Sequence, residues 1–187
     1  MNLAEAIENR RSVRSYTAQK VDKATIDQLI AAAIQAPSAS NAQPWSFAVI
    51  QDAALLKDYS DRTKKMLLAA MTADSPHAKY RSMLANPDFN IFYTAGTLLM
   101  IYAKPRGLHS YGDCCLAAQN TMLTAHSLGL GTCWIGFART LLDLPETKRE
   151  LGVPEDYTIV APIIVGYPQG RIPQLSRDEP EILFWRE

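Results

Sequence analysis

The chain has 187 residues, of which 48% are hydrophobic and 20% charged, with 19 basic and 19 acidic side chains and three cysteines. This length fits one domain spanning residues 1–187, and a formal net charge of zero gives no overall field that would recruit nucleic acid or an acidic membrane surface. The N-terminus becomes charged at once and lacks the pattern of a signal peptide, and no apolar run approaches the roughly 18 residues of a membrane span. The cysteines have neither disulfide nor metal-ligand spacing. We therefore expect a cytoplasmic protein with reduced thiols.

The first half of the chain predicts helices separated by one strand. In chain order, the elements are a helix that begins after Asn2, a helix over residues 22–36, a polar loop over 37–44, a strand over 46–50 and a helix over 52–71. Glu5 completes a capping-box pattern with Asn2, and Pro37 ends the second helix because it disfavours helical geometry in the residue before it. Residues 72–88 are predicted as a loop with one helical segment, and they are the best candidate for a lid. Four aromatic residues near this stretch are candidates either for lining a pocket or for packing: Tyr80, Phe89, Phe92 and Tyr93.

The second half of the chain supplies most of the predicted sheet. Its elements are a strand over residues 97–103, a helix from 110 that ends at Gly129, a strand over 132–135, a helix over 145–151, a strand over 159–165 and a strand-like tail over 181–185. The helix from residue 110 carries small and apolar residues on several faces, so it is either a central helix or part of a subunit interface. Pro162 lacks an amide donor and predicts a bulge or one unpaired side in its strand. The tail can pair with the sheet edge of another chain. Together these elements predict an α+β fold with a helix-covered sheet.

Motifs of several enzyme classes are absent from the sequence. It contains no P-loop, no G-x-S-x-G and no H-E-x-x-H. Gly129 and Gly131 follow a helix and lack a third glycine at the spacing of a dinucleotide-binding turn. The three histidines lie far apart without a ligand pattern, so neither hydrolysis nor metal catalysis is indicated.

A compact group of basic residues follows the first helix. Arg10, Arg11, Ser12 and Arg14 place guanidiniums and a hydroxyl within five positions, which suits a phosphate. A solvated basic patch at a helix end, favoured by the helix dipole, explains the same residues and is the simpler interpretation of the cluster taken alone.

The polar loop over residues 37–44 is a second candidate site. Ser38, Ser40, Asn41 and Gln43 provide hydroxyls and amides on a segment bounded by prolines. Such groups can read the edge of a planar heterocycle without adding charge, but a capped turn also explains them and is the simpler interpretation of the loop taken alone.

Four motifs in series resemble the nitroreductase family. They are Arg10-Arg11-Ser12-Val13-Arg14, the run from Ala36 to Trp45 (APSASNAQPW), the run from Asp113 to Gly136 that begins Asp-Cys-Cys-Leu and ends Trp-Ile-Gly, and Val165-Gly166-Tyr167-Pro168 with a downstream arginine. The resemblance covers essentially the whole chain in order. It implies a homodimeric α+β protein that holds one FMN per subunit at the dimer interface, with the C-terminal strand of each chain added to the sheet of its partner.

The resemblance also implies ligands for the FMN phosphate. Arg10 and Ser12, within the cluster that includes Arg11, would bind this group with help from the C-terminal arm. The spacing favours Arg177 for that role over Arg171. A phosphate with a charge of about −1.5 to −2 is well matched by two arginines and a hydroxyl.

Other residues would surround the flavin ring. Arg14 would lie near N1 and the C2 carbonyl, where a cation stabilises the charge that develops on reduction. Ile135 and Gly136 would line the isoalloxazine, with the Gly136 amide directed towards N5. From the partner subunit, the flavin would be approached by Pro37, Ser38, Ala39 and Asn41, with Gln43 close enough to help.

The activity implied is that of an FMN-dependent oxidoreductase with no catalytic protein acid or base and no metal. NADH or NADPH would pass hydride to flavin N5, and a small-molecule acceptor such as a nitroaromatic, a quinone or an enone would then take the electrons. The alternatives are a relative that performs reductive dehalogenation, a non-catalytic flavin-binding protein on the same scaffold, and a structural dimer without cofactor.

Overall fold

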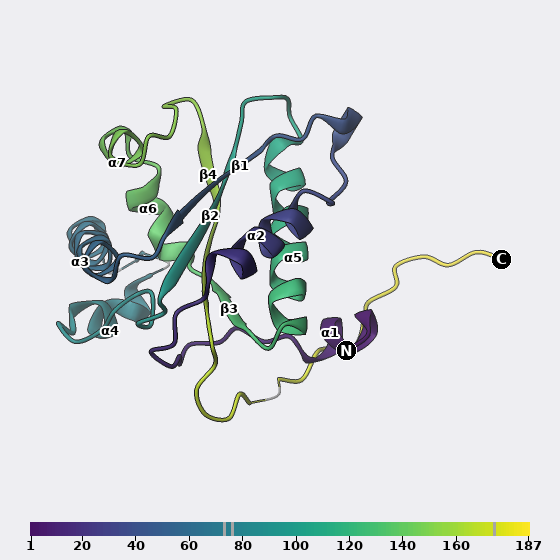
Figure 1. Cartoon of the computed structure of the whole chain (residues 1–187), viewed down its shortest axis with the longest axis horizontal. Coiled ribbons are helices and arrows are strands. Elements are labelled where there is room, and N and C mark those ends of the chain that lie inside the picture. The colour runs from purple at the N-terminus through teal and green to yellow at the C-terminus, as the bar shows by residue number, and fades with distance from the viewer. Residues whose placement is uncertain (73, 76, 174) are drawn as a thin grey trace.

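The protein has an α+β fold built around one antiparallel sheet (Figure 1). The computed structural model describes residues 1–72, 74, 75, 77–173 and 175–187. The strands are β1 (Trp45–Ile50), β2 (Thr97–Ala103), β3 (Gly131–Trp134) and β4 (Thr158–Gly166). They are arranged in the order β1-β2-β4-β3, so β2 and β4 occupy the centre.

Helices cover both faces of the sheet (Figure 1). They are α1 (Leu3–Asn9), α2 (Lys23–Ala33), α3 (Ala53–Ala70), α4 (Arg81–Ala85), α5 (Ser110–Ser127), α6 (Arg139–Leu142) and α7 (Pro145–Glu150). α2 and α5 pack on one face, and α3, α4 and α6 pack on the other. None of the helices in the described part of the chain is both long enough and apolar enough to cross a bilayer.

Two apolar clusters fill the space between the sheet and the helices. Leu98 and Met100 of β2 face the cluster beneath α3 and α6, whereas Leu99 and Ile101 face the cluster beneath α2 and α5. This division follows from the alternation of side chains along a strand. Because both of its faces are covered, every residue of β2 is buried, and this accounts for the continuous apolar run in its sequence.

The predicted elements from residue 2 to residue 166 are confirmed to within a few residues, including the capping box at Asn2. The prediction of one unpaired side at Pro162 is confirmed: Pro162 pairs with Met100 of β2, and the ladder between β4 and β3 ends at Ile163. The bulge itself lies at Val160, which has no partner in β2 because Ile101 faces Ala161 and Tyr102 faces Ile159. The candidate lid contains a short turn and α4 in its described part, while Ala73 and Pro76 lie outside the described residues.

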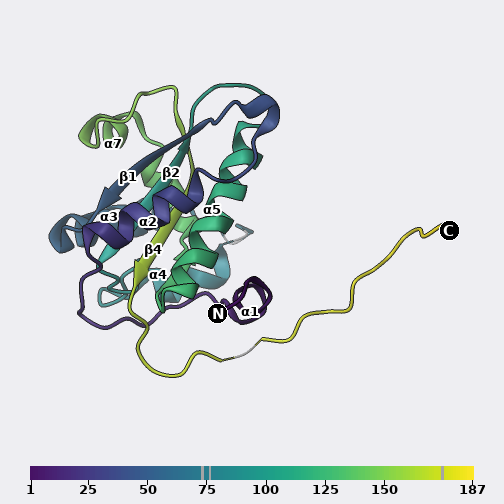
Figure 2. The ribbon, with the colours of Figure 1, turned by 45° about the vertical axis from the view of Figure 1, so that its right-hand side comes forward.

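The C-terminal residues form an extended arm that leaves the body of the molecule beside α1 (Figures 1 and 2). Within the single chain, residues 181–185 form no strand, and the side chains of Leu183, Phe184 and Trp185 are 88%, 78% and 76% exposed. The predicted strand therefore lacks a partner in its own chain, and its addition to a second chain stays a prediction.

Candidate functional site

Residues 10–17 form an extended segment along the edge of the sheet at β3. The backbone N–H of Val13 donates to the oxygen of Thr132 at 2.9 Å, and Ser12 forms a parallel bridge with Thr132. Two glycines that face each other in register, Gly131 and Gly166, make this close approach possible. A Cβ atom on Gly131 would lie 2.7 Å from the side chain of Val13. The arginines that flank Val13 are thereby fixed against the sheet.

The segment lines a basic hollow of about 340 Å³ at the C-terminal end of α5. Its described lining includes Asn9, Arg10, Arg11, Val13, His126, Gly129 and Thr132. No acidic side chain occurs among these described lining residues. Burial, followed by the nearby Arg177 and Arg11, lowers the pKa of Arg10. A local excess of positive charge therefore exists at this hollow although the chain is neutral overall.

Polar atoms in the basic hollow lack partners. Within the described part of the chain, the buried Nε atom of Arg11 and the buried Nε2 atom of His126 have no hydrogen-bond partner. Burial first, and then Arg10 and Arg11, lower the pKa of His126. The sequence alone assigned no role to this histidine, because it lies more than 100 positions from the arginines and no spacing pattern links them. Two neighbouring arginines, one of them with an unpaired buried Nε, and a lining without a described carboxylate fit an anion such as a phosphate.

A second and larger hollow of about 610 Å³ is lined by the next residues of the same two segments. Arg14 and Cys133 line this hollow, and they directly follow Val13 and Thr132 of the basic hollow. The remaining described lining is mostly aromatic and apolar: His77, Tyr80, Met83, Ile91, Tyr93, Tyr111, Trp134, Ile135, Gly136, Phe137 and Arg139. We call this space the aromatic hollow.

Several predicted site residues lie in the aromatic hollow. Arg14 is 5.9 Å from the ring centroid of Tyr93, and Ile135 and Gly136 lie where β3 ends. No described atom lies within 4 Å of the point where a Cβ atom on Gly136 would be, so its backbone borders open space. Of the four aromatic candidates, Tyr80 and Tyr93 line the hollow, while Phe92 is buried in the core and Phe89 packs on Tyr93.

The loop over residues 37–43 lies elsewhere. The backbone N–H of Ala39 donates to both carboxylate oxygens of Asp113 at 3.3 Å, which fixes the loop at the N-terminal end of α5. Inside the loop, the hydroxyl of Ser38 accepts from the Gln43 backbone, and the Gln43 side chain donates to Asn41.

The basic hollow lies at the opposite end of α5, about 27 Å away for a helix of 18 residues. None of the described residues of the loop, among them Pro37, lines either hollow. A single chain thus brings together the arginine segment and the end of β3, but not the loop.

Comparison with known proteins places the chain in a family. The profile of the nitroreductase family matches residues 7–167. This range contains most of the residues that line the two hollows, and it leaves out the C-terminal arm. The chain belongs to the nitroreductase family. A protein of Archaeoglobus fulgidus, provisionally named NADH dehydrogenase/NAD(P)H nitroreductase, is 31% identical over 163 residues that cover 87% of this chain and 83% of the relative.

Two further similar proteins carry descriptions that name FMN. A Bacillus subtilis protein named FMN reductase (NADPH) is 29% identical, with 94% of this chain and 71% of the relative aligned. A solved structure of a nitroreductase from Bacteroides fragilis with bound FMN covers the whole of both chains at 26% identity and a TM-score of 0.85. The predicted family and fold are thereby confirmed.

Proposed function

We propose that the chain is one subunit of an FMN-dependent oxidoreductase that takes hydride from NADH or NADPH and passes electrons to an organic acceptor. The observation that carries this proposal is that one short segment of the chain lines both hollows. Successive residues of one segment, Val13 and Arg14, lead from a basic space free of described acidic lining into a wider aromatic one. A flat ring that bears a phosphate has this distribution of charge and apolar surface.

The proposed roles follow the two hollows. Arg10 and Arg11 of the basic hollow bind the phosphate, together with Ser12, the next residue of the segment, which is not among the described lining of either hollow. Arg177 of the arm joins them, since it lies close enough to Arg10 to lower the pKa of that guanidinium. His126 is added to this set because its unpartnered Nε2 atom lies among the same arginines.

Around the ring, Arg14 stabilises negative charge at one edge, and Ile135 and Gly136 form the surface beside it. Bound there, FMN supplies the atom that accepts and releases hydride, so the chain needs no acid or base of its own. The protein contributes binding, orientation and the exclusion of water.

The proposed active unit is a homodimer. Pro37, Ser38, Ala39, Asn41 and Gln43 lie too far from the basic hollow of their own chain to reach the same ligand, so they are assigned to the ring held by the partner subunit. The exposed apolar side chains of the arm are assigned to the same interface.

An anaerobic absorbance titration of the purified protein tests the proposal. We expect a flavin band that NADH or NADPH bleaches and that a nitroaromatic or a quinone restores. A flavin band that neither donor bleaches would identify a non-catalytic flavoprotein. Colourless protein whose fluorescence and melting temperature are unaffected by added FMN would contradict the proposal altogether.

A further inference from the structure

Arg139 and Tyr111 form a pair at the margin of the aromatic hollow. Arg139 is the first residue of α6, directly after the turn that begins at Gly136, and Tyr111 lies in the first turn of α5. The Nη1 atom of Arg139 donates to the hydroxyl of Tyr111 at 3.2 Å, and the guanidinium lies 5.4 Å from the centroid of the tyrosine ring. The aromatic side chain therefore holds the guanidinium at a defined place in the lining.

This guanidinium has no acidic partner among the described residues. No described carboxylate lies within 4.0 Å of Arg139, and the described lining of the hollow contains no aspartate or glutamate. An arginine has five N–H donors in a planar fork, and the hydrogen bond to Tyr111 uses one of them. The geometry of the fork matches a carboxylate, which it binds through two parallel hydrogen bonds.

The surroundings of the pair favour a flat ligand. The ring of Phe137 meets those of His77 and Tyr80 edge to face, with centroids 5.6 and 5.4 Å apart. Aromatic walls of this kind prefer aromatic ligands, which they can stack on or meet edge to face. Arg14, the other cation of the hollow, has been assigned above to the flavin ring, which leaves Arg139 for a second ligand.

We propose that the aromatic hollow selects an aromatic acid as its acceptor, and that Arg139, positioned by Tyr111, binds the carboxylate of that acid. The inference rests on the proposed function for the electron transfer itself. It adds the chemical class of the acceptor and a residue that determines specificity. Neither residue belongs to the motifs on which the family resemblance was based.

The test compares 4-nitrobenzoate with 4-nitrobenzamide, which share the nitro group and differ in charge. We expect the flavin-loaded protein to bind the carboxylate about tenfold more tightly than the amide in calorimetry, and to reduce it with a correspondingly higher kcat/KM. Arg139→Gln should weaken binding of the carboxylate about tenfold or more and change binding of the amide less than twofold. Arg139→Lys should restore part of the difference, because lysine keeps the charge without the fork.

Arg149→Gln is the matched control, since it removes an exposed arginine of α7 that lines neither hollow. We expect this variant to behave as the wild type with both compounds. A second variant, Tyr111→Phe, removes the hydroxyl that accepts from Arg139 and should raise KM for the carboxylate alone, with kcat unchanged.

Two outcomes would overturn the inference. Equal affinity of the wild type for carboxylate and amide is one. The other is an Arg139→Gln variant that still binds 4-nitrobenzoate but reacts with NADH and no longer with NADPH. That result would assign the guanidinium to the extra phosphate of NADPH. Failure of both nitro compounds and of a quinone to reoxidise the reduced flavin would instead contradict the proposed function. Calorimetry would still test the anion site, because it requires no turnover.

Discussion

Single residues in the candidate site act through charge and through close contact. Arg10 is half-buried in a hollow whose described lining has no carboxylate, with Arg11 and His126 beside it. Burial first, and then the neighbouring Arg177 and Arg11, lower the pKa of Arg10, because a partly buried cation beside other cations is unfavourable in the absence of an anion. The cluster is therefore best explained by a ligand that carries the compensating charge.

The first prediction concerns Arg10. We expect Arg10→Ala to weaken FMN binding by about 2 kcal/mol or more, because a charge-assisted hydrogen bond to the phosphate is lost. Fluorescence titration of the apoprotein measures this change, and Arg149→Ala provides a control for the loss of one positive charge. FMN affinity equal to that of the wild type in Arg10→Ala would refute the assignment of the phosphate to the basic hollow.

The second prediction concerns the close approach at Gly131. Gly131→Ala would bring a methyl group to 2.7 Å from the side chain of Val13, so the segment that carries the arginines must move. We expect a loss of about 1–3 kcal/mol in the free energy of unfolding, together with weaker FMN binding. Gly112→Ala is the control, since no described atom lies within 4 Å of its added carbon, and in a helix alanine is favoured over glycine by roughly 1 kcal/mol. In urea denaturation, the free energy of unfolding should fall for Gly131→Ala and rise for Gly112→Ala. A stabilised Gly131→Ala variant would disprove the packing argument.

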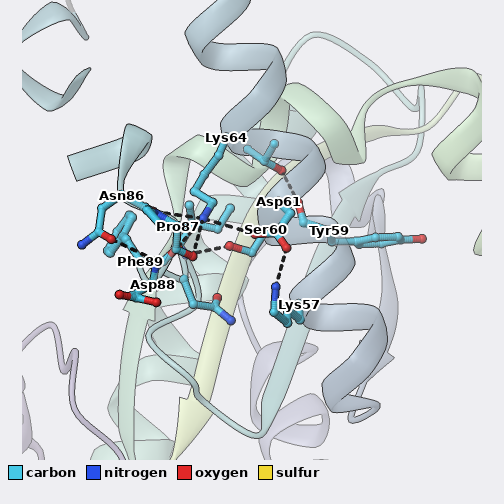
Figure 3. Close-up of polar contacts among 12 residues, drawn as sticks. Lys57, Tyr59, Ser60, Asp61, Lys64, Asn86, Pro87, Asp88 and Phe89 are labelled. Atoms are coloured by element: carbon cyan, nitrogen blue, oxygen red, sulfur yellow. Dashed lines mark hydrogen bonds and ion pairs between the residues drawn. The ribbon is translucent and has the colours of Figure 1, made fainter. Parts of the chain in front are cut away.

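At the scale of elements, a buried lysine ties α3 to the segment that leads into the aromatic hollow (Figure 3). The ammonium of Lys64 donates to the backbone oxygens of Asn86, Pro87 and Phe89 at 3.3, 3.4 and 2.6 Å. It also pairs with Asp61 at 3.2 Å, and the lysine side chain is only 8% exposed. A buried charge is tolerated here because its donors are satisfied.

The third prediction follows from this contact. Lys64→Met leaves three backbone oxygens without their donor, and we expect the free energy of unfolding to fall by about 2–3 kcal/mol. The ring of Phe89 packs edge to face on Tyr93, with centroids 5.6 Å apart, so the wall of the aromatic hollow should loosen as well. Lys65→Met, an exposed change one position along the same helix, should alter stability by no more than about 0.5 kcal/mol. Similar denaturation midpoints for the two variants would show that the lysine contact contributes little.

The elements differ in how far the sequence could predict them. The boundaries of β2 and α5 were predictable because an apolar run and a helical pattern each had a clear stop. The four-residue helix α6 was missed, since it is too short for a periodic signal and its first residue has no side-chain cap. The bulge at Val160 depends on the register with β2, which local patterns do not encode.

In the site, too, the sequence could predict groups of neighbouring residues but not contacts between distant ones. The arginines at 10–14 were found because they are neighbours in the sequence. Arg139 and Tyr111 were missed because they are 28 positions apart, and only the packing of α6 against the start of α5 brings them together. A lone arginine three residues after Gly136, in an otherwise apolar stretch, was the one signal available.

At the scale of the whole molecule, apolar surface is left uncovered along α1, α5 and the arm. Leu3 and Ile7 of α1 are 68% and 57% exposed, and Leu116 of α5 is 47% exposed. α1 and the arm lie on the same side of the body as α5 (Figure 2). Exposed apolar area of this extent is typical of an interface between chains. A second copy of the chain would also supply the 37–43 loop, which each chain holds away from its own basic hollow.

The fourth prediction tests this arrangement through the arm. Removing residues 181–187 takes away Ile182, Leu183, Phe184 and Trp185 but keeps Arg177. Since one fully buried side chain of this kind contributes up to about 1.5–3 kcal/mol, even partial burial predicts a dimer dissociation constant raised at least tenfold in sedimentation experiments.

Removal of residues 186–187 alone, which are charged, should leave the dimer unchanged. Because the proposed ring site needs the partner's loop, the truncated protein should also release FMN on dilution at concentrations where the full chain retains it. A dimer that withstands the larger truncation would mean that α1 and α5 hold the subunits together without the arm.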